Sequence, residues 1–159
     1  MQQRILRKED YPLHEKASDT LVIQCSDSLF QEAFNDFVRE ELGIKTRSLI
    51  AIPGASQVLT FSDYLPKFAM ALLRPLRFLV KELGLRRVIV IMHEECRWYR
   101  DFVPTYFSMK GNIKNRQIED ALAGKRIISE EFPDLEIRMF YAAITPQRRV
   151  SFSEIVEKK

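Results

Sequence analysis

Val-Ile-Val-Ile-Met occupies residues 88–92 of this chain, and His93-Glu94-Glu95-Cys96 follows it directly. A continuous run of apolar, mostly β-branched residues predicts a strand that is covered on both faces, as in the centre of a parallel sheet. His93 and Cys96 lie three residues apart, so they can face the same direction if the chain turns helically after the strand. The stretch therefore predicts an α/β fold with a reactive group at a strand exit.

Three other segments also predict strands. Residues 20–24 form a compact β-prone run that ends at Cys25, and residues 48–52 form a second buried strand closed by Pro53. Residues 135–141 alternate between apolar and polar side chains, which is typical of a strand nearer the edge of a sheet.

Helical periodicity separates these strands. Apolar residues recur at three- and four-residue steps over about 28–42, 63–83 and 114–132, with Gly43 and Gly84 as expected helix stops. Alternating strands and helices predict an α/β fold with a mainly parallel, four- to five-stranded sheet flanked by helices.

The length of 159 residues fits one domain, so we expect a single domain over residues 1–159, with the polar residues 1–18 as an N-terminal arm. The net charge of +3 is slight and predicts no nucleic-acid partner; Arg148 and Arg149 are expected to belong to a solvated terminus. No apolar stretch has the length of a membrane span, and the N-terminus lacks the apolar core of a signal peptide. We therefore expect a cytoplasmic protein with no membrane partner.

We do not expect Cys25 and Cys96, the two cysteines of the chain, to form a structural disulfide, because the cytoplasm is reducing. Ligands of open α/β sheets bind beyond the carboxyl ends of strands, where the strand order reverses. If the strands ending at Cys25 and His93 are neighbours, the two thiols and the imidazole meet in one crevice. Such a donor set favours zinc, held by Cys25, His93 and Cys96.

Asp27 leaves two possibilities open. Its carboxylate can accept a hydrogen bond from a metal-bound water, which keeps the site open, or it can become the fourth ligand itself, which closes the site. Taken alone, an aspartate between two serines is most often a helix N-cap.

At these residues the chain resembles the β-class carbonic anhydrases. That family binds zinc through Cys-x-Asp-x-Arg after its first strand and His-x-x-Cys after its third, which correspond here to residues 25–29 and 93–96. The helix, Leu-Gly turn and strand over residues 76–90 are similar to the family, and residues 52–56 fall where the family has an Asn-Ala-Gly loop.

The resemblance implies a zinc ion on Cys25, His93 and Cys96 and the reversible hydration of carbon dioxide, or of a related small substrate, by zinc-bound hydroxide. It assigns Asp27 a catalytic role as the hydrogen-bond partner of that hydroxide. It also implies a homodimer or a higher homo-oligomer.

Leu29 stands where the family has an arginine that pairs with the aspartate and holds it off the metal. Without that partner, Asp27 is free to close the site, so the alternative is a catalytically silent relative whose zinc has a structural or interaction role. Arg97 and Arg47 are the two candidates to replace the missing arginine. Met92 and Arg97 also replace glycines that usually flank the family's His-x-x-Cys.

A thiol enzyme without metal is a third hypothesis. A phosphatase-type nucleophile needs an arginine six residues after the cysteine, where this chain has Gln31, and redox pairing of Cys25 with Cys96 needs the two thiols close together. Eight aromatic residues can form either ordinary core or a subunit interface: Phe61, Tyr64, Phe68, Trp98, Tyr99, Phe102, Tyr106 and Phe107.

Overall fold

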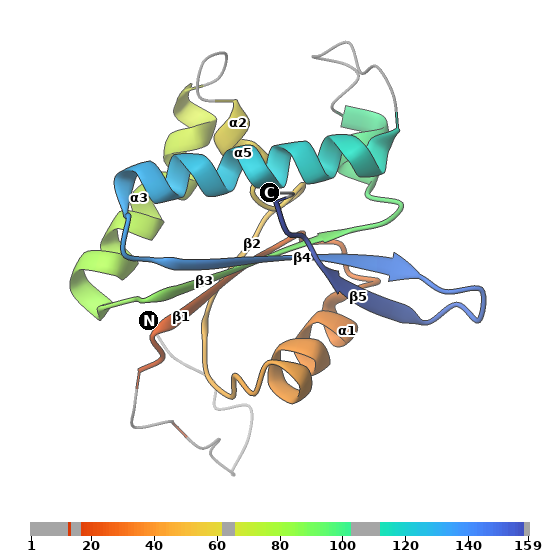
Figure 1. Cartoon of the computed structure of the whole chain (residues 1–159), viewed down its shortest axis with the longest axis horizontal. Helices are drawn as coiled ribbons and strands as arrows, with labels where there is room; N and C mark the ends of the chain where they lie inside the picture. The colour runs from red at the N-terminus through yellow and green to blue at the C-terminus, as the bar shows by residue number, and fades with distance from the viewer. Residues whose placement is uncertain (1–12, 14–16, 62–65, 103–111, 158–159) are drawn as a thin grey trace, which may run out of the picture.

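The computed structural model describes residue 13 and residues 17–61, 66–102 and 112–157. Most of the predicted N-terminal arm lies outside these residues. The chain forms a sheet with helices on both faces (Figure 1). Within the described ranges, no helix is long and apolar enough to cross a membrane.

The sheet has five strands in the order β2-β1-β3-β4-β5. Neighbours among the first four strands are parallel, and the last strand is antiparallel to its neighbour. The predicted fold class is therefore confirmed. The strands are β1 (Thr20–Gln24), β2 (Ser48–Ala51), β3 (Arg87–His93), β4 (Glu136–Ile144) and β5 (Val150–Glu154).

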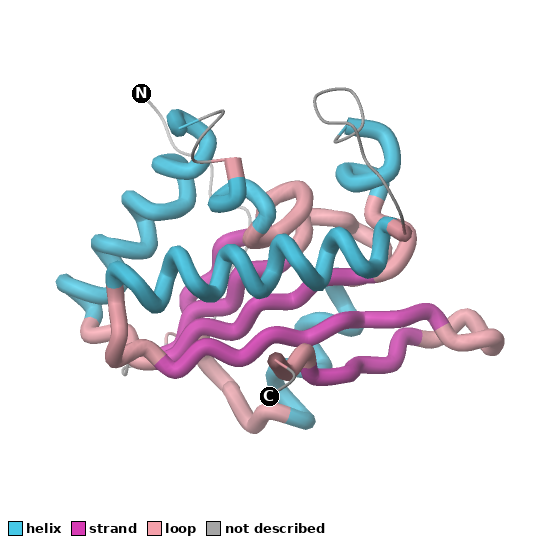
Figure 2. Tube along the Cα trace, turned by 45° about the horizontal axis from the view of Figure 1, so that its top comes forward, coloured by secondary structure: helices cyan, strands magenta, loops and turns pink. Residues whose placement is uncertain are grey.

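Helices pack on the two faces of the sheet and divide the core. The long helices lie on one face and the short helical segment after β1 lies on the other (Figures 1 and 2). Each face has its own cluster of buried apolar side chains, as the continuous apolar pattern of β3 requires. The helical segments are α1 (Gln31–Asp36), the π-helical η1 (Phe37–Glu41), α2 (Gln57–Thr60), α3 (Pro66–Leu83), the π-helical η2 (Trp98–Phe102) and α5 (Ile113–Glu131).

Strand β4 is the penultimate strand of the sheet, nearer the edge than β3, as its alternating sequence predicted. The short strand β5 covers it, and Arg138 of β4 forms an ion pair with Glu154 of β5 at 2.8 Å. The ring of Phe152 stacks on Phe37, with centroids 4.0 Å apart, which anchors β5 to the helical segment below the sheet. Arg148 and Arg149, which were predicted to belong to a solvated terminus, thus lie in the turn between β4 and β5.

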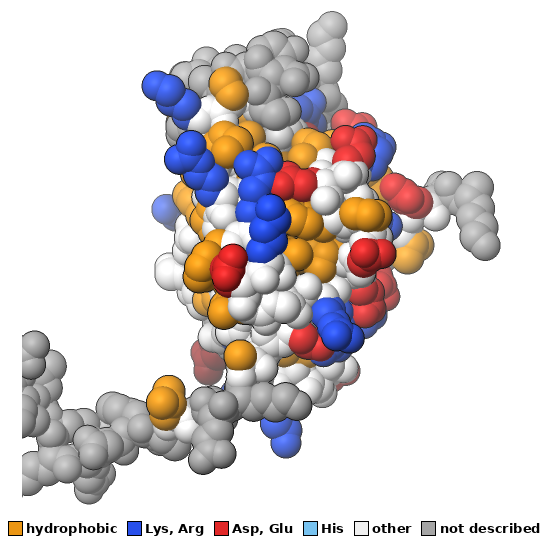
Figure 3. Space-filling view, turned by 90° about the vertical axis from the view of Figure 1, so that its left-hand side faces the viewer, with side chains coloured by type: hydrophobic (Ala, Val, Ile, Leu, Met, Phe, Trp, Pro, Cys, Tyr) orange, Lys and Arg blue, Asp and Glu red, His pale blue; other side chains and the backbone are white. Residues whose placement is uncertain are grey.

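The first helix also differs from its prediction, because it begins at Gln31 instead of about residue 28. Gly43 and Gly84 have positive φ angles of 66° and 65° after their helices, as expected of C-terminal stops. At the end of the molecule where α3 turns into β3, basic, acidic and apolar side chains are interspersed over the coloured part of the surface (Figure 3).

Candidate metal centre

The register of β1 against β3 brings the two predicted half-sites together. The strands are adjacent and parallel, and Gln24 lies opposite Ile91, so Cys25 and His93 leave the sheet at the same edge. The chain continues from β1 to β2 on one side and from β3 to β4 on the other. The site therefore lies where the strand order reverses, the usual place for a ligand in such a sheet.

The turn after β3 depends on the two glutamates between His93 and Cys96. Glu95 adopts a φ of 57°, a left-handed conformation that is uncommon for a residue with a side chain. The amide of Glu94 donates to the carbonyl of Ala142 at 2.9 Å, and its carboxylate accepts from the amide of Ile144 at 2.7 Å. These two hydrogen bonds fix the turn to the end of β4, so Glu94 has a structural role.

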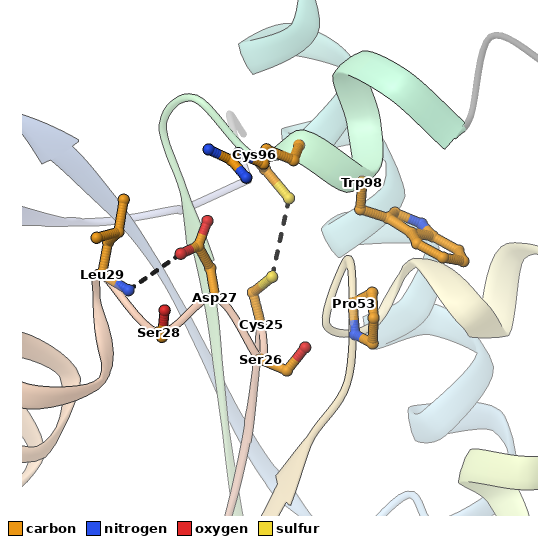
Figure 4. A pocket seen from close by; sticks show the side chains of 9 residues that line it. Cys25, Ser26, Asp27, Ser28, Leu29, Pro53, Cys96 and Trp98 are labelled. Atoms are coloured by element: carbon orange, nitrogen blue, oxygen red, sulfur yellow. Dashed lines mark hydrogen bonds between the residues drawn. The ribbon is translucent and has the colours of Figure 1, made fainter.

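One ligand atom from each of Cys25, His93 and Cys96 lies within 4.8 Å of the other two. All three side chains are buried. The two sulfur atoms face each other at 3.8 Å (Figure 4). Three soft or borderline donors at this spacing fit a zinc ion, which takes thiolate and imidazole ligands in a tetrahedral arrangement.

The imidazole of His93 has one nitrogen free. Its Nδ1 lies 2.8 Å from the carbonyl oxygen of Glu94, and because a carbonyl can only accept, Nδ1 carries the proton. Nε2 is then an unprotonated acceptor, and it is buried without a hydrogen-bond partner. The ring of Phe30 packs on the imidazole at 4.2 Å between centroids. A buried nitrogen with a free lone pair beside two sulfurs suits a metal ligand.

Gln117 of α5 holds the backbone of His93, because the side-chain amide of Gln117 donates to the carbonyl of His93 at 2.8 Å. Sequence patterns did not point to Gln117. Its only signal is a polar residue on the buried face of an amphipathic helix.

The two thiols affect each other's ionisation. The hydrogen bond with Cys96 lowers the pKa of the Cys25 thiol, against the opposing effect of burial. The same hydrogen bond, burial and the charge of Cys25 raise the pKa of Cys96. The contact between the two sulfurs thus favours ionisation of Cys25 and disfavours ionisation of Cys96. Helix α1, expected from about residue 28, begins six residues after Cys25, so its N-terminus is not adjacent to this thiol.

Asp27 is half-buried near the cluster but does not belong to it. Its Oδ1 accepts a hydrogen bond from the amide of Leu29 at 3.0 Å (Figure 4). This contact is a local turn in which the side chain mimics backbone, and the N-cap position of α1 belongs to Phe30. The ligand group of Cys25, His93 and Cys96 does not include Asp27, so its place on the metal stays a prediction.

A cavity of 370 Å³ opens beside the two sulfurs, lined by Cys25, Ser26, Asp27, Ser28, Leu29, Pro53, Cys96, Arg97 and Trp98. Leu29 is 78% exposed at its mouth. Between the two proposed substitutes for the missing arginine, Arg97 shares this cavity with Asp27. Arg47 lies at the amino end of β2, away from the site, where its guanidinium binds the side chain of Asn35.

Trp98 forms one wall of the cavity and rests on the loop after β2. A Cβ atom on Gly54 would lie 2.4 Å from Cδ1 of Trp98, and Gly54 has a φ of 74°, so a glycine is required there. The indole nitrogen of Trp98 donates to Oε1 of Gln57. The loop at residues 52–56 therefore supports the cavity wall.

A buried polar network extends this support to α5. Asp120 accepts hydrogen bonds from the Gln57 amide at 3.2 Å, the Tyr99 hydroxyl at 3.0 Å and Arg116 at 3.2 Å. Burial raises the pKa of Asp120, and the three donors oppose that change. The sequence did not identify Gln57 or Asp120, because no local pattern distinguishes them from the other polar residues of α2 and α5.

The aromatic residues proposed as core or interface differ in their burial. Phe61 and Tyr99 are buried, whereas Trp98 and Phe102 are partly exposed. Met92 is buried in the same apolar cluster as Cys25 and Cys96. The remaining aromatic positions lie outside the described residues or have side chains that the structure does not describe: Tyr64, Phe68, Tyr106 and Phe107.

Comparison with known proteins supports the fold. No protein-family profile and no curated protein matches the sequence. The β-carbonic anhydrase isoform I of Trichomonas vaginalis matches with a TM-score of 0.60 and 14% identity, over 94% of this chain and 88% of that one. The β-carbonic anhydrase CafD of Aspergillus fumigatus matches with a TM-score of 0.54 and 13% identity, over 90% of this chain and 91% of that one.

A tetrameric β-carbonic anhydrase of Sordaria macrospora matches with a TM-score of 0.51 and 13% identity, over 87% of this chain and 81% of that one. At such identities the likeness shows the fold alone. The chain has a β-carbonic-anhydrase-like fold, and its Cys25–His93–Cys96 group can bind a metal ion.

Proposed function

We propose that this protein is a zinc protein of the β-carbonic-anhydrase type, with Cys25, His93 and Cys96 as the zinc ligands. The observation that carries the proposal is the approach of three buried ligand atoms to within 4.8 Å, one of them on an imidazole whose Nε2 has no other partner. Zinc bound there would act as a Lewis acid and make a water molecule nucleophilic near neutral pH.

The reaction that this site supports best is the hydration of carbon dioxide or the hydration or hydrolysis of a related small carbonyl compound. Asp27 lines the same cavity as the two sulfurs, so its carboxylate is the acceptor assigned to orient the attacking water. Pro53 and Trp98 supply apolar wall on the opposite side, where a neutral substrate can lie.

A catalytically silent relative is the second candidate. Within the described parts of the chain, Asp27 forms no ion pair, and the amide of Leu29 is a weak restraint on it. An unpaired carboxylate near two thiolates and an imidazole can become a fourth zinc ligand, which would exclude water. The zinc would then stabilise the fold or an interaction surface.

Three measurements on the freshly purified chain separate these outcomes: zinc per chain by elemental analysis, the zinc ligands by X-ray absorption at neutral pH, and carbon dioxide hydration by stopped flow. One zinc per chain with hydration above the buffer rate supports the enzyme. One zinc with an additional carboxylate oxygen ligand and the buffer rate supports the silent relative. Protein without zinc contradicts both and leaves the metal-free thiol hypothesis.

The same proposal includes assembly and location. Because the Sordaria macrospora protein of the same fold is tetrameric, we expect a homo-oligomer here as well. Thiol ligands also stay reduced in the cytoplasm, where we place the protein. Sedimentation velocity of the full chain measures the assembly, and a monomer at all concentrations tested would contradict it.

A further inference from the structure

A second cavity adjoins the metal centre on the side of the β4–β5 hairpin. It has a volume of 280 Å³ and shares Asp27, Leu29 and Arg97 with the first cavity. Small-molecule sites in proteins have volumes of about 300–1,000 Å³, whereas carbon dioxide has only three heavy atoms. The two cavities together offer room for a larger molecule.

The second cavity is rich in guanidinium groups. The carboxyl-bearing residues Asp27 and Glu95 line the same cavity. One of the arginines is already neutralised, since it binds Asp101 through two hydrogen bonds of 2.7 and 2.8 Å. The other three form no ion pair within the described residues. The four arginines are Arg97, Arg100, Arg148 and Arg149, of which Arg100 is the paired one.

The hairpin that carries two of these arginines is held in a defined shape. Thr145 accepts hydrogen bonds from the amides of Arg148 and Arg149 at 2.9 and 3.1 Å, and its own amide donates to the Arg149 carbonyl at 2.8 Å. Arg148 has a φ of 58°, a strained conformation for a residue with a side chain. Strain of this kind persists where surrounding contacts enforce it and is concentrated at functional sites.

The hairpin is also fixed to the metal centre. The carboxylate of Glu94, which follows the proposed ligand His93 in the chain, accepts from the amide of Ile144 at the end of β4. Figure 1 shows the hairpin extending beyond the ends of the neighbouring strands. The arginines of the hairpin and those after β3 therefore line one cavity, which adjoins the cavity beside the two sulfurs.

We propose that this second cavity binds the anionic group of a carboxylate- or phosphate-bearing substrate, whose carbonyl carbon reaches the first cavity. This inference rests on the proposed chemistry at the metal centre and names its substrate class. Guanidinium groups bind carboxylate and phosphate through paired hydrogen bonds, and they are the side chains that proteins use for this purpose. Leu29, on the wall common to both cavities, supplies apolar contact for the body of the molecule.

Calorimetric titration of the zinc-loaded full chain with inorganic phosphate and with succinate tests the site. We expect saturable binding of at least one probe, weakened by added salt. The double variant R148Q/R149Q should bind that probe at least about tenfold more weakly. The matched control is R126Q, since Arg126 is an exposed arginine of α5 outside both cavities. It should bind like the wild type.

A further variant, Cys25→Ser, separates the arginine site from the metal. We expect Cys25→Ser to lose zinc and keep probe binding, and circular dichroism establishes whether this variant is folded. If Cys25→Ser is unfolded, R97Q in the zinc-loaded protein serves as a second variant that should weaken probe binding. Binding that depends on Cys25 and not on Arg148 and Arg149 would place the anion on the metal and overturn the inference. Absence of saturable binding of both probes would also overturn it, while the zinc content, measured separately, tests the proposed function.

Discussion

The sulfur atoms of Cys25 and Cys96 lie 3.8 Å apart, although 71 positions separate them in the chain. Adjacent strands β1 and β3 carry them to one edge of the sheet, and a strained turn at Glu95 directs Cys96 back toward Cys25. Both sulfurs are buried, so the pair is a preformed part of the core. The experiments below test what that pair and its surroundings do.

Replacing Cys25 with serine should remove the metal. The variant loses one thiolate of a three-ligand site, so we expect zinc per chain to fall from one to near zero after dialysis against a weak chelator. Ser26→Ala changes the exposed neighbour on the same cavity and should retain full zinc. Elemental analysis measures both, and equal zinc in the two variants would contradict the assigned ligand.

Leu29→Arg should restore the cation that the resemblance expects beside Asp27. Because Leu29 is 78% exposed, the free energy of unfolding should change by no more than about 0.5 kcal/mol. If loss of the arginine is what lets Asp27 close the site, the variant should hydrate carbon dioxide at least about tenfold faster than the wild type.

The matched control for this substitution is Leu29→Gln, which is polar but uncharged and should not raise the rate. X-ray absorption of zinc then reports whether Asp27 has left the metal. Equal hydration rates for L29R, L29Q and the wild type would show that Asp27 is not the cause of any inactivity.

Gly54→Ala should disturb the cavity wall more than Gly84→Ala does. Both glycines have positive φ angles, so both substitutions cost about 1 kcal/mol in backbone strain. Only at Gly54 would the added Cβ collide with Trp98, at 2.4 Å, whereas nothing lies within 4 Å at Gly84. Trp98 is the one tryptophan of the chain, so its fluorescence reports the displacement directly.

The emission spectrum should shift to longer wavelength in Gly54→Ala as Trp98 becomes more exposed, and it should be unchanged in Gly84→Ala. Chemical denaturation measures the accompanying loss of stability. Equal spectra and equal losses in the two variants would mean that Trp98 does not depend on a glycine at position 54.

Asp120→Ala should destabilise the fold through the donors that it leaves behind. The buried Tyr99 hydroxyl, the Gln57 amide and Arg116 all lose their acceptor, which we expect to cost about 2–4 kcal/mol. The adjacent Glu119→Ala alters an exposed residue and should cost less than about 0.5 kcal/mol. Urea unfolding compares the two, and a loss as small for Asp120 as for Glu119 would contradict the network's importance.

Much of this site follows from local sequence. The β-branched run at residues 88–92 determines a doubly covered strand whatever its neighbours are, and the apolar run at 20–24 does the same. Reactive residues directly after such strands must lie at one edge of a parallel sheet. The ligand group of Cys25, His93 and Cys96 could therefore be proposed before the fold was known.

Other features of the structure could not be predicted from local sequence patterns. Strand β5 is only five residues long, and although Val150 and Phe152 alternate with serines, its place in the sheet depends on pairing with β4 and on packing of Phe152 on Phe37. The arginines at 148 and 149 consequently seemed to belong to a solvated terminus. The network around Asp120 likewise joins residues from three separate segments, α2, η2 and α5, and no local pattern within any of them marks a residue as part of a buried network.

The sequence by itself determined the α/β class and the residues able to hold a metal, because hydrophobic periodicity and donor chemistry are local properties. Only the tertiary structure decided that Asp27 turns to the Leu29 amide, that Arg97 and not Arg47 shares its cavity, and that the hairpin arginines adjoin the metal centre. Those relationships depend on strand order and on contacts between distant segments, which no short stretch of sequence specifies.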